Sequence, residues 1–238
     1  MMQPGKGPIN TPEGARIGRR GMRGVLAAGL VLGMLGGILG LGLGGCSWLA
    51  MASEKVGGKN VPADYKTLDD KSLAIVIYPD WATGLEYAGA RDEIGAFTTA
   101  QMREFLPKTK LVNYKEVIHW QDDTQQWRNM EMKEIGKHFG VDRILYIEVL
   151  DYRSRQPGSD NLLQGRIHAM ARIYETDAAG PAAAWEKEFD VTWPNIPEGP
   201  PKTNDLTVRR RVLEAFSVQL VGNFYEHKDY GEYLRDPK

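Results

Sequence analysis

The sequence predicts an α/β (α+β) fold: a mixed β-sheet of about five strands packed by about three helices, in the order β-α-β-α-β-β-β-α. Two early apolar runs alternate with segments of helical periodicity, which favours parallel strands joined through helices. Two later segments alternate apolar and polar residues on either side of a turn, as in an antiparallel hairpin. A final amphipathic segment predicts a closing helix.

We expect order to begin near Ser72. The run Leu73–Tyr78 is almost continuously apolar and ends at a Pro-Asp pair, which is typical of a strand buried on both faces. Residues 87–106 carry an approximate apolar stripe and stop before a proline, so they predict a helix. Residues 110–113 form a possible short strand.

The middle of the chain predicts a second helix and the clearest strand. In residues 127–139, apolar side chains recur three and four positions apart, and Gly140 follows where a helix-ending glycine belongs. Residues 144–150 are almost wholly apolar and predict the next strand, which continues to Tyr152.

The best-defined feature is the hairpin formed by residues 167–173 and 185–193, in which apolar and polar residues alternate. The apolar positions are Ile167, Ala169, Ala171 and Ile173 in one strand and Trp185, Phe189, Val191 and Trp193 in the other. A turn around residues 176–181 joins the two strands. If this turn is centred near Ala179, it sets two cross-strand pairs: Arg172 opposite Glu186, and His168 opposite Asp190. Residues 194–202 contain four prolines and predict a rigid connector or an extended recognition strip, and residues 206–225 predict the last helix.

The amino-terminal region differs in composition from the rest. A basic cluster at residues 16–23 is followed by an uncharged apolar stretch from Val25 to Leu43, the layout of an export signal. The stretch closes on Leu43-Gly44-Gly45-Cys46, which resembles the bacterial lipobox. This resemblance implies cleavage between Gly45 and Cys46 and acylation of the Cys46 thiol, so that the chain binds a lipid bilayer.

Two alternatives to the lipobox are an uncleaved membrane helix and a plain secretory peptide. Ten of the 25 residues from Gly21 to Gly45 are glycine, which costs a permanent helix about 1 kcal/mol for each glycine relative to alanine. A plain secretory peptide leaves Cys46, the single cysteine, unexplained. Ser47 after the cysteine indicates, by resemblance to lipoproteins, the outer membrane. Met22 is an alternative start.

These features divide the chain into four parts: a signal peptide at 1–45, a flexible tether at 46–70, a single globular periplasmic domain at 71–230 and a tail at 231–238. Outside the signal, 25 basic residues face 30 acidic ones. A mildly acidic body does not fit nucleic-acid binding.

A second resemblance covers residues 72–226. A strand-helix-strand-helix start, the segment Gly140-Val141-Asp142-Arg143-Ile144-Leu145-Tyr146-Ile147-Glu148-Val149 and a glycine-bearing hairpin ending around Trp185 resemble one superfamily of envelope domains. It includes the amino-terminal domain of TolB, the curli-secretion protein CsgG and Lpo-type activators of penicillin-binding proteins. The resemblance implies binding to other envelope proteins, or assembly into rings, without catalysis.

Candidate sites for chemistry are sparse, and we predict no catalytic residue, cofactor or metal. His119 with Asp122 and Asp123 is the best candidate for a metal site, and an exposed helix-to-loop segment explains it equally well. His168 beside carboxylates is either a pH sensor or an ordinary surface residue.

Two tryptophans flank a polar segment that we expect to be a loop. Trp120 and Trp127 border residues 121–126, where they either anchor a partner or pack inward.

Our leading hypothesis is a noncatalytic accessory protein, anchored at the outer membrane, facing the periplasm and binding an envelope protein or a second copy of itself. One alternative is a component of a CsgG-like secretion or transport complex. It requires long amphipathic hairpins, whereas the 167–193 hairpin carries charges on one face and core residues on the other. A further alternative is an envelope hydrolase with an unrecognised site.

Overall fold

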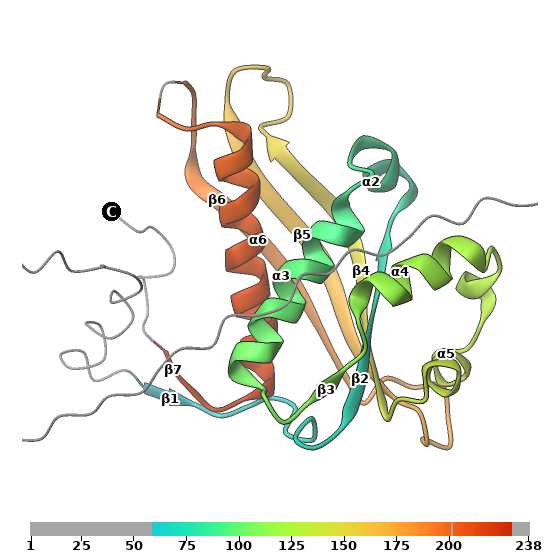
Figure 1. The fold of residues 1–238 in the computed structure, drawn as a ribbon. Coiled ribbons are helices and arrows are strands. Elements are labelled where there is room, and N and C mark those ends of the chain that lie inside the picture. Colours follow the sequence, from blue (N-terminus) through green and yellow to red (C-terminus); the bar gives the residue numbers. More distant parts are fainter. Residues whose placement is uncertain (1–58, 201, 230–238) are drawn as a thin grey trace, which may run out of the picture. The chain divides into compact units, whose positions relative to one another are not determined.

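The computed structural model describes residues 59–200 and 202–229. Within them, five strands form one mixed sheet in the order β3-β2-β4-β5-β6 (Figure 1). β2 pairs in parallel with β3 and β4, and β5 and β6 add antiparallel strands, as the sequence predicts. The strand bounds are β2 Ser72–Pro79, β3 Lys110–Leu111, β4 Arg143–Arg155, β5 Leu163–Glu175 and β6 Trp185–Glu198.

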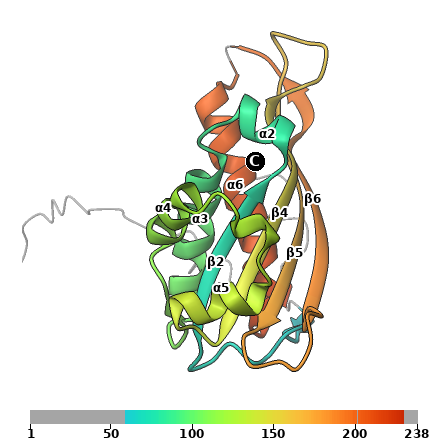
Figure 2. The ribbon, with the colours of Figure 1, turned by 90° about the vertical axis from the view of Figure 1, so that its right-hand side faces the viewer.

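Helices pack on both faces of this sheet, but unequally. α3 and α6 cover one face, called here the inner face, across β2, β4, β5 and β6. α4 and α5 pack on the opposite, outer face, over β2 and β4. Among the described residues α5 reaches only the end of β5 near Tyr174, and no helix lies on the outer side of β6 (Figure 2). The helix bounds are α2 Trp81–Glu86, α3 Ala90–Phe105, α4 Tyr114–Asp123, α5 Met132–Phe139 and α6 Asp205–Val221, with 3-10 turns η1 Trp127–Asn129 and η2 Gly222–Phe224.

The larger core lies between the inner face and helices α3 and α6. Ile75, Ile147, Ile167 and Phe216 are 1% exposed or less and meet there. Burying each such side chain contributes roughly 1.5–3 kcal/mol. The smaller core on the outer face includes Val76 and Ile135. β2 contributes to both cores in alternation, which explains its continuous apolar run.

The folded part begins earlier than Ser72, where we expected it to begin. Tyr65 is 8% exposed and Leu68 is fully buried, and both belong to the inner core. The backbone N–H groups of Asp64 and Tyr65 donate to the carbonyl of Asn223, just after α6. A short antiparallel pair, β1 (Lys59–Val61) with β7 (His227–Asp229), lies at the same end. Tyr65 and Leu68 are isolated apolar residues in a polar stretch, so the sequence offered no periodicity from which to predict their burial.

Two helices were not expected from the sequence. α4 begins at Asn113, whose side chain accepts a hydrogen bond from the Lys115 N–H, and it includes residues 121–123, which we had expected in a loop. Gln121 is 3% exposed and its Nε2 donates to the Ile77 carbonyl at 3.1 Å, so this polar residue is part of the core. α2 is a short helix that follows β2 directly.

Three expected boundaries are corrected by the structure. The helix expected at 127–139 is a 3-10 turn followed by α5, which ends, as predicted, at Gly140 with a φ of +62°. The helix expected at 87–106 begins at Ala90. The proline-rich segment is not only a connector, because β6 continues through it to Glu198.

Gly165 allows α6 to lie close to β5. A Cβ at this position would stand 2.9 Å from Cγ1 of Val212 and 3.0 Å from Cγ1 of Val208. Both valines are fully buried, so neither can turn away into solvent. The close approach of helix and strand therefore requires a residue without a side chain.

We expect Gly165→Ala to lower the free energy of unfolding by about 1–3 kcal/mol, because the added methyl overpacks the contact with α6. Urea denaturation followed by tryptophan fluorescence measures the change. Gly180→Ala is the control, since a Cβ there meets nothing within 4 Å. Equal stability of the two variants would contradict the close packing.

Candidate interaction surface

Six of the seven large apolar side chains that are exposed among the described residues lie at one end of the sheet, called here the apolar end. The six are Trp81, Leu85, Leu150, Leu162, Ile196 and Leu206. The seventh, Phe105, lies at the end of α3 towards β1 and β7. Single exposed apolar residues are ordinary, whereas a group at one end of a domain marks an interaction surface.

The sheet topology gathers these residues. β2, β4 and β6 run in the same direction, so all three end at the apolar end, the upper end in Figure 1. α2 starts directly after β2, the β4–β5 loop lies beside it, and α6 begins there (Figures 1 and 2). The most exposed side chains are Trp81 at 79%, Ile196 at 78% and Leu206 at 70%.

Carboxylates border the apolar end. Asp80 precedes Trp81, Glu86 follows Leu85, and Asp205 precedes Leu206. Asp151 likewise follows Leu150. None of the six exposed apolar residues has a lysine or arginine as its neighbour in the chain. Asp151 is ion-paired with Arg153 and Arg166, and Asp205 with Arg209, whereas Asp80 and Glu86 have no ion pair to a described residue.

A polar cluster fixes the three elements that display this surface. The Ser154 hydroxyl donates to Oδ1 of Asp205 at 2.5 Å, which joins the end of β4 to the start of α6. Ser154 also donates its backbone N–H to the Tyr87 hydroxyl at 3.2 Å, which joins β4 to the residue after α2. Ser154 is 1% exposed, so these hydrogen bonds satisfy a buried group.

The same cluster extends below the surface to α3. The hydroxyl of Tyr152, which is 1% exposed, donates to Oε2 of Glu93. Arg209 on α6 donates to the other oxygen of Glu93 at 2.7 Å. Burial, and then the hydrogen bond to Glu93, raise the pKa of the Tyr152 hydroxyl well above its usual range. The residues form a structural network of three hydroxyls, two carboxylates and one guanidinium, with no imidazole to activate a nucleophile.

The hairpin register is as the sequence predicts, and it gives the open outer face a set of ion pairs. Arg172 lies opposite Glu186 and bonds both to it and to Glu148. Arg166 donates two hydrogen bonds of 2.7 Å to Asp190, an arrangement that holds the pKa of Asp190 below its usual range.

His168 lies opposite Asp190, as expected, but its contact is with a different residue. Its Nε2 is 2.6 Å from Oε1 of Glu188, because Arg166 already occupies both oxygens of Asp190. The imidazole is 25% exposed and lies on the strand surface.

The expected metal candidate does not come together. His119 is 81% exposed and lies 3.4 Å from Asp123 one helical turn away. Asp122 pairs instead with Arg91 at 2.6 Å. Within residues 59–200 and 202–229, no three His, Cys, Asp or Glu side chains are grouped as metal ligands.

The two tryptophans considered as partner anchors pack inward. Trp120 stacks on His138, with ring centroids 5.0 Å apart, and contacts Phe139. Trp127 is 5% exposed and meets the ring of Tyr78 edge to face.

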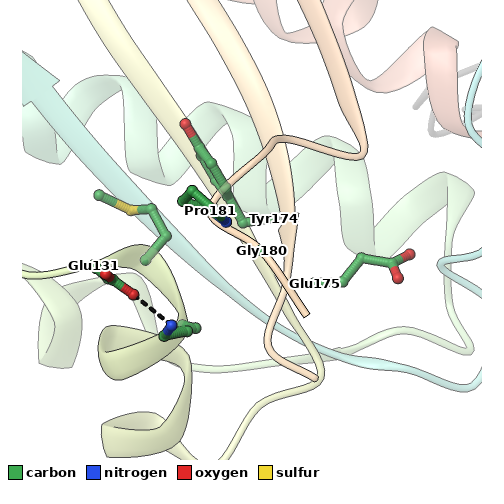
Figure 3. A pocket seen from close by; sticks show the side chains of 7 residues that line it. Glu131, Tyr174, Glu175, Gly180 and Pro181 are labelled. Atoms are coloured by element: carbon green, nitrogen blue, oxygen red, sulfur yellow. Dashed lines mark ion pairs between the residues drawn. The ribbon is translucent and has the colours of Figure 1, made fainter. Parts of the chain in front are cut away.

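Two cavities lie away from the apolar end. One, between α5 and the β5–β6 turn, has a volume of about 10 Å³, space for no more than a water (Figure 3). The other is an open groove of about 460 Å³ near β1 and β7, where Phe105 stacks on Tyr225 with centroids 4.9 Å apart. Lys66, Lys108, Asp69 and Glu226 line this groove, so it carries two charges of each sign, and Lys108 pairs with Asp69 at 3.6 Å.

No family model matches the chain, and no curated protein matches it. It is similar to several solved structures, among them the following three. Lipoprotein GNA1162 from Neisseria meningitidis is 16% identical with a TM-score of 0.40, covering 64% of this chain and 98% of that one. The PelC dodecamer from Paraburkholderia phytofirmans is 10% identical with a TM-score of 0.39, covering 70% and 95%. A minor lipoprotein from Acinetobacter baumannii is 11% identical with a TM-score of 0.32, covering 68% and 99%.

Two of these three structures are described as bacterial lipoproteins. Likeness at this TM-score and identity carries nothing about what this chain binds, and the TolB, CsgG and Lpo-type superfamily stays an expectation. Gly45 and Cys46 lie outside the described residues, so acylation also stays a prediction. None of the helices described is long and apolar enough to cross a membrane.

The exposed apolar residues were missed in the sequence because each looks like an ordinary core residue. The one available signal was position: Trp81 and Leu206 each follow an aspartate at an element boundary, where a core side chain is less expected.

We expect Tyr152→Phe to destabilise the protein by about 1–2 kcal/mol, because Glu93 loses a buried donor. Tyr146→Phe is the matched control: Tyr146 lies on the same strand, and its hydroxyl makes no hydrogen bond to a described residue. Urea denaturation of both variants measures the difference. A cost for Tyr146→Phe as large as that for Tyr152→Phe would contradict the role of the network.

Proposed function

We propose that this protein is a noncatalytic accessory lipoprotein of the bacterial cell envelope. It is held to the outer membrane by acyl chains on Cys46, and its periplasmic domain binds a partner protein through the apolar end. The observation that carries the proposal is the gathering of six exposed apolar side chains, bordered by carboxylates, at one end of the domain.

The attachment point lies at the end of the domain away from the apolar end, an arrangement that leaves the apolar end accessible to a protein partner. Lys59 pairs with Asp229 at the end where α6 finishes, opposite the apolar end (Figure 1). The 17 residues of α6 separate the two ends by roughly 25 Å. Twelve residues connect Cys46 to Lys59, and this connection joins the domain at the end remote from the apolar end.

Charge supports the same choice. Surfaces that lie in a bilayer interface carry lysine and arginine beside their apolar residues, because bacterial lipid surfaces are anionic. At the apolar end the chain neighbours of exposed apolar side chains are instead carboxylates, of which Asp80 and Glu86 have no ion pair to a described residue. A second copy would bring the same carboxylates against one another in a two-fold interface. The partner that fits has an apolar pocket with a basic rim.

Anchoring and partner binding are separable. We expect Cys46→Ser to leave the membrane fraction or to stay an unprocessed precursor, because serine supplies no thiol for acylation. Trp81→Ser should remain membrane-bound, since Trp81 contributes to the apolar end only. Membrane sedimentation with mass spectrometry of the amino terminus tests both. Normal maturation and sedimentation of Cys46→Ser would exclude lipid anchoring.

Partner binding is tested by a photo-crosslinking amino acid placed at position 81 in living cells. We expect an adduct with one envelope protein, and loss of that adduct on Leu85→Ser or Leu206→Ser, which remove neighbouring contact area. The same probe at position 105, the exposed apolar position outside the apolar end, is the control.

The captured protein is then purified and titrated with the wild type and Leu206→Ser, and a loss of affinity of about tenfold supports direct docking. Adducts with lipid alone would assign the apolar end to the bilayer, and adducts of twice the chain mass would assign it to a second copy. Either result, or no adduct at position 81, contradicts the proposed partner.

A further inference from the structure

β6 forms a long border of the sheet. It has 14 residues and, among the described residues, pairs with β5 alone. The border at the other side, β3, has only two residues. From Trp185 to Trp193 the strand contains no proline, so its backbone N–H and C=O groups continue without interruption. A strand of this kind is a template on which a further strand can pair.

The two faces of β6 differ in chemistry. On the outer face Glu186, Glu188 and Asp190 alternate along the strand. Their side chains stay 52%, 59% and 51% exposed although each has an ion-pair partner on β5. On the open face of β4, β5 and β6, five carboxylates meet three guanidinium groups and one imidazole, so negative charge is in excess.

The inner side of the same strand is apolar. Phe189 and Val191 are buried, and Trp185 and Trp193 pack partly buried against the inner core. The exception is Lys187, whose ammonium donates to Asp64 and Asn223 at the end near β1. A strand added beside β6 would therefore meet acidic neighbours on one face and apolar neighbours on the other.

A second copy does not fit this border. In an antiparallel pair, residues directly opposite share a face, so β6 against β6 places acidic positions opposite acidic positions in the registers that pair most of Trp185–Trp193. Like charges directly opposite are destabilising. The occupant that fits carries lysine or arginine at every second position, with apolar residues between them.

We propose that β6 is a strand-addition site for an extended basic segment of a partner protein, in which lysine or arginine alternates with apolar residues. The pairing would use backbone hydrogen bonds along Glu186–Trp193 for affinity and the three carboxylates for choice of partner. It depends on neither Cys46 nor the apolar end, so it stands or fails separately from the proposed function.

The test uses the full-length chain in a neutral detergent and a synthetic peptide alternating lysine and valine, with the length of the Trp185–Trp193 stretch. Fluorescence anisotropy gives the Kd, and hydrogen–deuterium exchange locates binding. We expect slower exchange of amides in Glu186–Trp193 with bound peptide. A peptide alternating glutamate and valine should not bind.

Two matched pairs distinguish strand addition from general charge attraction. Glu188→Lys should weaken binding by about fivefold, since it reverses one cross-strand charge pair. Glu116→Lys, an equal charge change at an exposed position on α4, should leave the Kd unchanged. The second pair consists of two lysine–valine peptides, one N-methylated at every lysine amide and the other at every valine amide, so that each has one edge that cannot donate hydrogen bonds. Only one of the two should bind, because a bound strand uses only one of its edges to pair with β6.

Each contrary result overturns the proposal. Equal weakening by Glu188→Lys and Glu116→Lys, binding of both N-methylated peptides, or protection outside β6 would mean that the peptide is held by charge alone or elsewhere. Absence of binding by the lysine–valine peptide would exclude a basic strand as occupant.

Discussion

Helix α6 lies against β5 at a separation that only small residues allow, and this contact organises the domain. The inner face of β5 carries Gly165, Ala169 and Ala171 between larger residues, all of them buried. Val208 and Val212 of α6 enter the space that side chains at Gly165 would fill. A helix seated so closely has little freedom to slide, and its first residue, Asp205, is thereby placed within reach of Ser154.

The apolar end follows from that placement. The hydrogen bonds of Ser154 and the contacts of Glu93 with Tyr152 and Arg209 tie β4, α3 and α6 together beneath it. Exposed Trp81 and Leu206 are consequently displayed by fixed elements, and a surface on fixed elements loses less conformational entropy when a partner binds. The outer face is organised differently: in the part of the chain that the structure describes, no helix covers β6 or most of β5. Paired charges cover this surface instead and keep it hydrated.

Much of the fold could be predicted because its strands have simple periods. The alternation in residues 167–173 and 185–193, together with the turn centre at Ala179, gave the register that places Arg172 opposite Glu186. The end of α5 at Gly140 followed from the φ of +62° that glycine adopts without strain. α4 could not be predicted, because the polar residue Gln121 lies on its buried face and interrupts the apolar stripe. Gln121 is buried there because its Nε2 donates a hydrogen bond to the carbonyl of Ile77, which is distant in the sequence. The burial of Leu68 also depends on residues far away in the sequence, because it packs in the inner core.

The order and spacing of residues close together in the chain were enough to predict the mixed five-stranded sheet, the hairpin register and a lipid on Cys46. The tertiary structure alone decided which apolar residues stay outside. Trp81, Ile196 and Leu206 are as hydrophobic as the core residues, and only the common direction of β2, β4 and β6 brings them to one exposed end. It also decided which carboxylate His168 meets, because the contact depends on where Arg166 bonds. The periodicity of apolar residues can be read from the local sequence, whereas the exposure of a side chain depends on which distant segments of the chain pack against it.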